Sequence, residues 1–423
     1  MMKTCILAVV LVVCFGVFAS AAALDNTHMG SKANAMGKAF TGLADDPSAV
    51  FYNPAGLVFQ REGLSVQTYG LYVMTDLTYT AATFPQTTFG PTLVPVSSTA
   101  YENKSDESVL FPGLFLNYHK GDVAVGVGLY VPYGGGKYKY DNYKGLTGMT
   151  VEQSLGLMAF GGSMAVRLSD SFSLGVSLTG YMGTYSFKKT LPAGLPAPFV
   201  SALGGSVEDD ISAVAAVGGN FGLMYKASDS LSFGATAKLP VRITVDGTTT
   251  ITNTEFDKAA ELRLPWYVTL GMALKASPEL TITFDFNYAL YSSMDKYTFL
   301  YRGYPDSNGQ VEDVRTGYTD ATYFALGADY KASDDLSLRG GVTFTPHATL
   351  DDAISLSCDV THITFALGGA YKFAPEFELT LSLHYLMGIE RTITGTTGVT
   401  GATGEQKFNK NALMIMTGIN LAL

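Results

Sequence analysis

The histidine and glycine residues of this chain do not form the spacings that catalysis or metal binding requires. Its five histidines are scattered, at His28, His119, His347, His362 and His384. Metal sites, serine nucleophiles and phosphate loops have short fixed patterns such as H-E-x-x-H, G-x-S-x-G and G-x-x-x-x-G-K-[ST]. None of these patterns is complete in the sequence. We therefore expect no metal and no cofactor.

Two partial patterns leave an enzyme as the less favoured alternative. Ser382 and His384 share one predicted strand face, and Gly134–Lys137 places three glycines before a lysine. A serine nucleophile also needs a third group to orient its base, and a phosphate loop needs further positions. We expect no enzymatic activity, with an outer-membrane lipid hydrolase as the alternative.

Several charged and imidazole side chains fall on faces that we predict to be interior. They are Lys238, Arg242, Arg263, Asp285, Asp329, Arg339, Glu378, His362 and His384. An arginine or lysine among them could pair with the carboxylate of a ligand. Pairing with one another, or anchoring a neighbouring segment, is the more common role. The candidates for lining a ligand pocket are Lys238, Arg242, Arg263, Arg339 and His384.

Composition limits the elements that could position these residues. The chain has 423 residues, of which 47% are apolar and 15% charged, with 46 glycines, 25 tyrosines and 25 phenylalanines. Soluble domains carry about 25% charged residues. This composition excludes a disordered chain. The net charge of -10 argues against nucleic acid as a partner, and three cysteines exclude a disulfide-stapled fold.

The first residues predict export. Lys3 precedes an apolar run from Cys5 to Phe18, and small residues follow at 19–23. This pattern is typical of a secretory signal peptide spanning residues 1–23. No later segment offers about 18 consecutive apolar residues, the length of a spanning helix. A closed β-barrel is the remaining way to cross a membrane with every backbone group satisfied.

Period-two alternation supports this all-β reading. Apolar and polar residues alternate along Leu280–Tyr288, Phe377–Tyr385 and Leu262–Leu274. Such alternation places one set of side chains on each face of a strand. A soluble β-sandwich would show the same period, so the alternation alone does not choose between them.

The connections favour the barrel. Short turns such as Lys226–Leu231 and Lys331–Leu336 alternate with long polar stretches such as Thr83–Ser108 and Thr190–Asp210. Short periplasmic turns and long external loops are the pattern of bacterial outer-membrane barrels. The pattern predicts a transmembrane antiparallel β-barrel of about fourteen strands over residues 61–423, with six short turns and seven long loops.

Residues 24–60 do not alternate and precede the first strand. Asp46 can cap a helix that begins at Pro47, and Asn53 followed by Pro54 would end it. A barrel of this size leaves an aqueous channel unless something fills it. We expect residues 24–60 to form a partly helical hatch that plugs the lumen. A periplasmic tail is the alternative.

Three hatch segments also carry a family resemblance: Met36–Phe40, Ala44–Ala49 and Tyr52–Leu57. They resemble the N-terminal hatch signature of FadL-type outer-membrane transporters for long-chain fatty acids and other hydrophobic compounds. Leu262–Trp266 resembles the Leu-Pro strand entry of that family, and Asp320–Gly327 and Leu367–Tyr371 resemble its late strands. The likeness runs over nearly the whole mature chain and is most specific in the hatch.

The resemblance implies a monomer in the bacterial outer membrane that passively imports fatty acids or hydrocarbons. Its partners would be the hydrophobic ligand and membrane lipid. The ligand would bind among the outer loops, enter a barrel pocket and leave sideways beside a kink in the third strand. The hatch motif would be Asn53, Pro54, Ala55 and Gly56. The kink would be formed by Pro132, Tyr133, Gly134, Gly135 and Gly136.

One departure from the family bears on the ligand. Fatty-acid members carry a lysine just before the Asp-Ala that opens a late strand, and this chain has Thr319 there. The departure leaves neutral hydrocarbons open as ligands. A general diffusion porin is the other alternative. It would need a more charged lumen and no hatch.

Overall fold

The computed structural model describes most of the chain. The described residues are 28–83, 87–89, 92–94, 101–141, 143, 148–194, 205–251, 253–302, 310–354, 358–395 and 403–423. The predicted signal peptide, residues 1–23, lies outside them. In the described part, no helix is long and apolar enough to cross a membrane.

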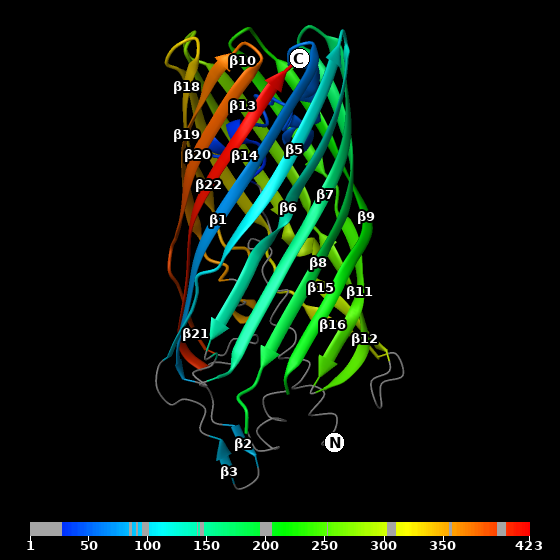
Figure 1. The fold of residues 1–423 in the computed structure, drawn as a ribbon, viewed down its shortest axis with the longest axis vertical. Coiled ribbons are helices and arrows are strands. Elements are labelled where there is room, and N and C mark those ends of the chain that lie inside the picture. The colour runs from blue at the N-terminus through cyan, green and yellow to red at the C-terminus, as the bar shows by residue number, and fades with distance from the viewer. Residues whose placement is uncertain are drawn as a thin grey trace.

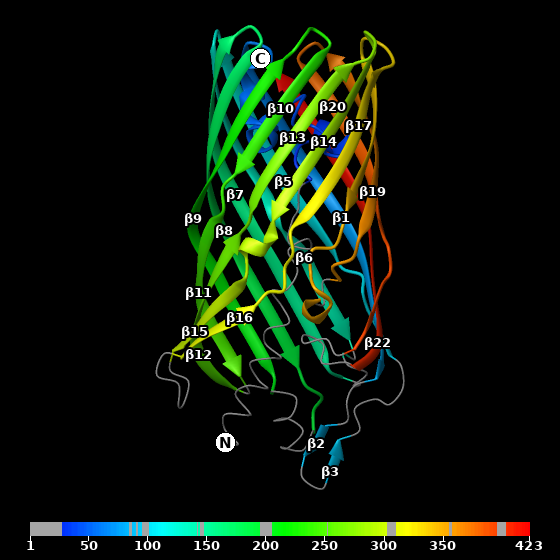
Figure 2. The same ribbon diagram turned by 180° about the vertical axis from the view of Figure 1, so that it is seen from behind.

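The strands form one closed antiparallel barrel of fourteen spanning strands, as predicted from the alternation and the turns. The first and last strands close it: β1 (Gly63–Thr83) pairs with β22 (Thr403–Ala422) from Ser65↔Ala422 to Thr83↔Thr403. Figures 1 and 2 show the tilted strands running around a single cylinder.

Some spanning strands are interrupted and therefore carry two labels. Between β1 and β22, the spanning strands in chain order are β4 with β5 (Tyr101–Ser105, Ser108–Lys120), β6 (Val123–Asp141), β7 (Thr150–Ser169), β8 (Phe172–Thr190), β9 (Val207–Lys226), β10 with β11 (Leu231–Lys238, Val241–Ile251), β12 with β13 (Thr254–Leu264, Trp266–Lys275), β14 with β15 (Leu280–Leu290, Lys296–Arg302), β16 with β17 (Gln310–Arg315, Ala321–Lys331), β18 (Leu336–Thr345), β19 (His362–Ala374), and β20 with β21 (Phe377–Gly388, Arg391–Thr394). A separate hairpin pairs β2 (Thr87–Phe89) with β3 (Thr92–Val94). Short 3-10 turns are η4 (Tyr291–Ser293) and η5 (Asp351–Ala353).

The connections at the two ends differ in length. Short turns such as that from β7 to β8 lie at the end that carries the C-terminus (Figure 1). The opposite end has the longer connections, with one exception that contradicts the predicted pattern. β11 ends at Ile251 and β12 begins at Thr254, which makes a tight hairpin. Asn253 adopts a left-handed φ of 70° there, a conformation that asparagine tolerates.

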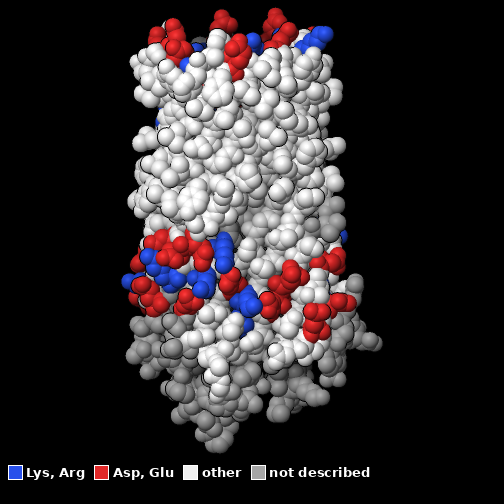
Figure 3. All heavy atoms as spheres, in the orientation of Figure 1, with Lys and Arg blue, Asp and Glu red and all other residues white. Residues whose placement is uncertain are grey.

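A broad apolar belt surrounds the barrel. Leu367 and Leu381 are 69% and 58% exposed on the outer face, whereas Ser382 and His384 are buried on the inner face. Figure 3 shows this uncharged belt between a charged rim and a collar of charged side chains. An outward apolar band is the lipid-facing surface of an outer-membrane barrel.

The alternation reverses beyond the belt where β10 continues into β11. Lys238 faces the bore, and after Leu239 and Pro240 the inward residues are Val241 and Ile243. Proline cannot donate to the strand ladder, and the break advances the chain by one residue. A shift of one residue moves every following side chain to the other face.

The same reversal occurs at Pro265 between β12 and β13, because Leu264 and Tyr267 are both buried. As a result, Arg242 and Arg263 lie on the outside, with side chains 64% and 42% exposed. Both contact Glu261, at 3.3 and 3.5 Å. Our prediction that these two arginines line the lumen was therefore wrong. The prediction assumed that the period-two alternation continues unchanged across Pro240 and Pro265. The strand instead shifts by one residue at each proline, so the following side chains change faces.

The segment from His28 to Phe59 is buried inside the barrel, near the end with the short turns (Figure 1). It contains α3 (Ser31–Ala35), α4 (Ala49–Tyr52) and η2 (Pro54–Phe59). We call it the hatch.

Inward-facing glycines make room for the hatch. At each of them an added Cβ would come within 2.7 Å of a hatch atom: Gly126, Gly175, Gly222, Gly234, Gly271, Gly327, Gly341 and Gly368. At these positions the hatch therefore approaches the wall more closely than any larger residue would allow.

Candidate functional site

Asn53 joins two hatch segments to the barrel wall. Its side chain is fully buried, and its Nδ2 donates to the carbonyl oxygens of Thr41 at 2.9 Å and Leu223 of β9 at 3.0 Å. Its Oδ1 accepts a hydrogen bond from Ala55 N at 3.1 Å, which caps η2. Pro54 begins that turn, and a Cβ on Gly56 would lie 2.4 Å from the Ala44 carbonyl oxygen. The predicted hatch motif thus occupies a close-packed junction.

Polar wall side chains bind the hatch backbone. Asp285 Oδ2 of β14 accepts hydrogen bonds from the amides of Phe40 and Thr41, at 3.0 and 2.9 Å. Ser173 of β8 and Ser232 of β10 donate to hatch carbonyls, each at 2.7 Å. Short helices leave many backbone groups without an intrahelical partner. These inward side chains supply such partners.

An ion-pair chain ties the hatch to β17 and β18. Lys32 Nζ lies 2.8 Å from Asp45 and 3.1 Å from Asp329, and Arg339 Nε lies 3.1 Å from Asp329. Burial alone would lower the pKa of Lys32, but the two carboxylates raise it above its ordinary value. Arg339 therefore belongs to the contact between hatch and wall, because it shares Asp329 with Lys32 of the hatch.

His384 also lies against the hatch. Its Nε2 is 2.8 Å from Ser382 Oγ, and its ring meets that of His28 edge-on with centroids 5.6 Å apart. Neither Arg339 nor His384 is among the described residues that line the pocket in the bore.

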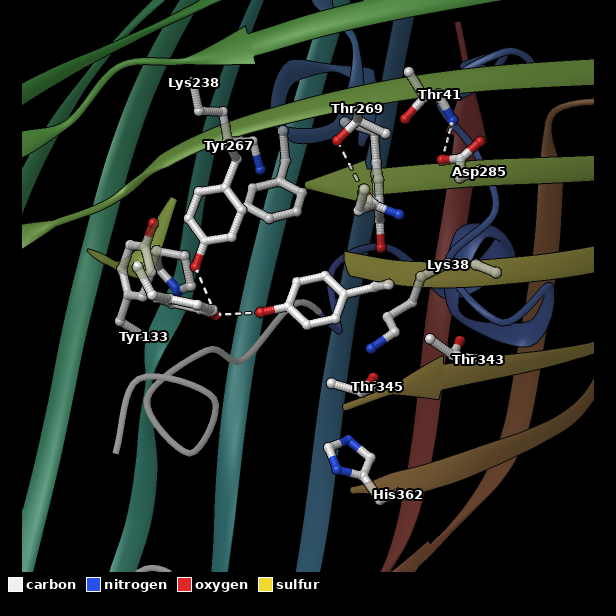
Figure 4. Close-up of a pocket in the computed structure, with 17 residues that line it drawn as sticks. Lys38, Thr41, Tyr133, Lys238, Tyr267, Thr269, Asp285, Thr343, Thr345 and His362 are labelled. Carbon is white, nitrogen blue, oxygen red and sulfur yellow. Dashed lines mark hydrogen bonds between the residues drawn. The ribbon is translucent and has the colours of Figure 1, made fainter. Parts of the chain in front are cut away.

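That pocket is a cavity of about 100 Å³ in the bore, on the outer side of the hatch. Figure 4 shows side chains from the hatch and from several strands converging on it. The hatch contributes Lys38, Thr41, Phe51 and Tyr52. The wall contributes Pro132, Tyr133, Lys238, Tyr267, Thr269, Asp285, Asn287, Tyr291, Tyr323, Ala325, Thr343, Thr345 and His362.

The pocket combines aromatic rings with a few charged and hydroxyl groups. Lys238 Nζ lies 3.4 Å from the centroid of the Phe51 ring, a cation–π contact. Tyr267 and Tyr323 donate hydrogen bonds to the Tyr291 hydroxyl, at 3.1 and 2.6 Å. Asp285 is the one acid among the described lining residues. A cavity that combines aromatic rings with charged and hydroxyl groups suits a molecule that has both an apolar part and a polar end.

Sequence reasoning identified Lys238 but missed Lys38 and Tyr291. Lys38 follows α3 with a left-handed φ of 71°, and its side chain points toward the bore in Figure 4. Tyr291 lies in η4, which interrupts the wall between β14 and β15. Neither position follows from periodicity, because both lie outside regular strands.

The predicted kink segment lies within β6. The register between β6 and β7 shifts between Tyr130 and Tyr133 and again between Tyr133 and Gly136. Gly134 has a φ of 131°, and a Cβ there would lie 2.5 Å from the Leu155 carbonyl oxygen. Such irregularities bend a strand and increase its local twist. Pro132 and Tyr133 of this segment border the pocket.

The pairing of β6 with its other neighbour is short. In the described residues, the ladder with β5 runs from Lys120↔Val123 to Leu114↔Leu129 and goes no further. Toward the outer end, Lys139 N donates to Ser105 Oγ at 2.9 Å. We call the interval between these two contacts the β5–β6 window.

Within the described residues, no group of three or more His, Cys, Asp or Glu side chains is placed to hold a metal ion. The pocket and the hatch–wall contacts described above offer surfaces for binding, hydrogen bonds and ion pairs.

Comparison with known proteins places this geometry in a family. Residues 10–422 match the family described as "Outer membrane protein transport protein (OMPP1/FadL/TodX)". Outer membrane protein P1 of Haemophilus influenzae is 25% identical over 178 residues, which are 40% of this chain and 38% of that protein. The match thus spans about two fifths of this relative.

Solved structures share the fold. A Pseudomonas aeruginosa FadL homologue has a TM-score of 0.79 at 16% identity, covering 94% of this chain and 99% of that one. The Pseudomonas putida toluene transporter TodX has a TM-score of 0.71 at 17% identity, covering 95% and 100%. The family match covers nearly the whole sequence and confirms the resemblance seen in the hatch residues. This chain therefore belongs to the OMPP1/FadL/TodX family of outer membrane transport proteins.

Proposed function

We propose that this protein is a monomeric channel for passive uptake of hydrophobic molecules, either long-chain fatty acids or hydrocarbons. The solved relatives include a toluene transporter, which supports hydrocarbons as one class of cargo. A single chain closes the barrel and encloses the pocket, so a second copy is not needed to complete either.

The outer half of the bore favours apolar solutes. Many of its buried side chains are apolar or aromatic, including Tyr79, Tyr140, Phe187, Ile243 and Phe408. Removing apolar surface from water stabilises a ligand by roughly 25 cal/mol per Å². A hydrophobic molecule would therefore move from the exterior into the outer half of the bore and then to the pocket.

Lys38 and Lys238 would recognise an anionic end of the ligand. They approach the pocket from the hatch and from β10, and a carboxylate can bind both. Thr319 does not line the pocket. Its amide donates to the Ala348 carbonyl at 2.8 Å, outside β17. The two pocket lysines thus supply the cation that the sequence lacks at position 319.

The exit would be the β5–β6 window. One observation carries this step: Pro132 and Tyr133 border the pocket and belong to the part of β6 that lies beyond the end of its ladder with β5. A ligand leaving there would pass from the pocket into the lipid without crossing water. Pro132, Tyr133 and Gly134–Gly136 would shape this route. The Asn53–Gly56 motif would hold the hatch, which closes the direct route along the bore.

The proposal is tested by uptake into liposomes that contain the purified protein. We expect uptake of a long-chain fatty acid and of a monoaromatic hydrocarbon, with little flux of a small sugar. Flux of the sugar alone would contradict the proposal and support a general diffusion porin.

Lys238→Met should slow fatty-acid uptake several-fold and leave hydrocarbon uptake unchanged, because it removes the cation but keeps an unbranched side chain of similar size. Lys188→Met is the matched control, since Lys188 pairs with Glu208 at 3.1 Å and both side chains are more than half exposed. Equal slowing of both ligands by Lys238→Met would contradict a role in carboxylate recognition.

A further inference from the structure

The connection between β18 and β19 turns inward and is buried. Ala348, Thr349, Ile354, Cys358 and Val360 are each at most 2% exposed. External loops of a barrel are usually solvated, so complete burial of five positions in one connection shows that it packs against other parts of the protein. We call its described residues, 346–354 and 358–361, the outer lid.

The outer lid reaches across the bore. Near one end, Thr349 forms an isolated bridge with Tyr318, beside β17. Near the other end, Cys358 Sγ lies 3.8 Å from the Thr78 carbonyl oxygen of β1 and 3.9 Å from the Tyr140 hydroxyl of β6. In the wall, β20, β22, β1 and β5 lie between β19 and β6. Because Cys358 and Tyr140 are both buried and these strands lie between them in the wall, the lid contacts β6 inside the barrel.

The lid lies on the side of the pocket opposite the hatch. Along β18, the Thr343 side chain donates a hydrogen bond to the hatch carbonyl of Gly37, and Thr345 lines the pocket two residues further out. The lid follows directly, and His362, where the chain returns to the wall, lines the pocket as well. The pocket therefore lies between two inward segments.

Arg391 joins the two ends of the lid. It begins β21 and is only 9% exposed. Nη1 donates to Thr349 Oγ1 at 3.1 Å and to the Asp359 carbonyl at 3.0 Å. Nη2 donates to the Thr349 carbonyl and to Asp351 Oδ1, both at 2.7 Å.

Asp359 completes this network from the lid itself. Its Oδ2 accepts hydrogen bonds from Ala348 N and Thr349 Oγ1, both at 2.8 Å. One guanidinium thus binds both halves of the lid through a rigid set of donors, a geometry that lysine could not reproduce.

We propose that the outer lid, held by Arg391, is a second seal of the bore, in series with the hatch, and that Arg391 thereby sets the exclusion of hydrophilic solutes. Release of the hatch alone would leave the channel closed to water-soluble molecules. A hydrophobic ligand would reach the pocket past the lid, whose buried face is largely apolar.

Cys358 provides a reporter of lid position. Burial raises the pKa of its thiol to about 12, so the reactive thiolate is scarce while the lid is in place. Arg391→Ala should increase labelling of Cys358 by a water-soluble maleimide by about tenfold or more, because local opening exposes the thiol. The full chain is labelled in lipid vesicles, and the modified peptide is identified by mass spectrometry.

Arg315→Ala is the matched control. Its guanidinium lies 3.6 Å from Asp352 of the same lid, but both side chains are more than 60% exposed, and we expect labelling at the wild-type rate. If Arg391→Ala does not assemble, Thr349→Val removes the shared hydroxyl partner and keeps the charge. Wild-type labelling in the assembled variant would overturn the role of Arg391.

Sugar flux tests whether the two seals act in series. Arg391→Ala alone and Asn53→Ala alone should each remain nearly closed, whereas the double variant should admit a small sugar about tenfold faster than either. Full flux in Asn53→Ala alone, or wild-type flux in the double variant, would overturn the second seal. Neither result depends on uptake of the hydrophobic ligand, so a failure here is distinguishable from a failure of the proposed function.

Discussion

Replacing Asn53 with alanine tests how the hatch is held in the barrel. The substitution removes a side chain that makes three hydrogen bonds, to Thr41, Leu223 and Ala55. It leaves two carbonyl oxygens and one amide without this partner in a site that is fully buried. Leu223 belongs to the wall and the other two to the hatch, so the change weakens both the hatch itself and its attachment.

The size of the effect follows from the cost of unsatisfied buried groups. Each such group costs about 1–3 kcal/mol, and neighbouring losses are not fully additive. A total of about 3 kcal/mol is therefore expected for hatch release. Since 1.4 kcal/mol corresponds to a factor of ten, the released population should rise about 100-fold.

Hydrogen exchange measured by mass spectrometry reports this population directly. We expect protection of residues 36–58 to fall about 100-fold, while β1 and β22 keep their wild-type protection. Asn420→Ala is the control. Asn420 donates a hydrogen bond to Glu378 at 2.8 Å, and this bond joins two wall strands and involves no hatch residue. Unchanged hatch protection, or an equal loss in hatch and barrel, would refute the reasoning.

Two further predictions concern the hatch. Gly234→Ala should lower the free energy of unfolding and increase hatch exchange, because its Cβ would lie 2.0 Å from the Thr41 carbonyl oxygen, whereas Gly162→Ala should be neutral since nothing lies within 4 Å. Equal effects in the two variants, measured by thermal unfolding and exchange, would contradict the glycine–hatch contact. Burial, together with the charges of Lys38 and His384, lowers the pKa of His28 well below its usual value. Protonation therefore favours the released hatch, and the stabilisation is present above the ordinary pKa of about 6.5 and is lost as the pH falls below it. Protection factors near α3 should drop between about pH 7 and pH 5, and His28→Gln should weaken that dependence.

The barrel could be predicted from sequence because lipid imposes one rule on every spanning strand. Segments such as Leu280–Tyr288 must place apolar residues outward, and short turns mark where each hairpin reverses. The hatch was predictable for a different reason, namely that residues 24–60 break the alternation in front of a barrel wide enough to need a plug.

The interior was less predictable because it depends on contacts between distant segments. Period-two alternation continues in the sequence across Pro240 and Pro265, but the strand changes phase there, which moved Arg242 and Arg263 outside. Arg391 gave no local signal, since its role exists only when the lid folds back across the bore. The tight hairpin at Asn253 was missed because a polar, threonine-rich stretch resembles a loop.

The lateral route is tested most directly by photolabelling during uptake. A long-chain fatty acid carrying a diazirine would be added to vesicles containing the protein, illuminated, and its attachment sites mapped by mass spectrometry. The β5–β6 window predicts labels at the pocket and then at 110–113 of β5 and 130–136 of β6. Labels that instead continue through the hatch to Phe59 and Arg61, with none at the window, would contradict the account.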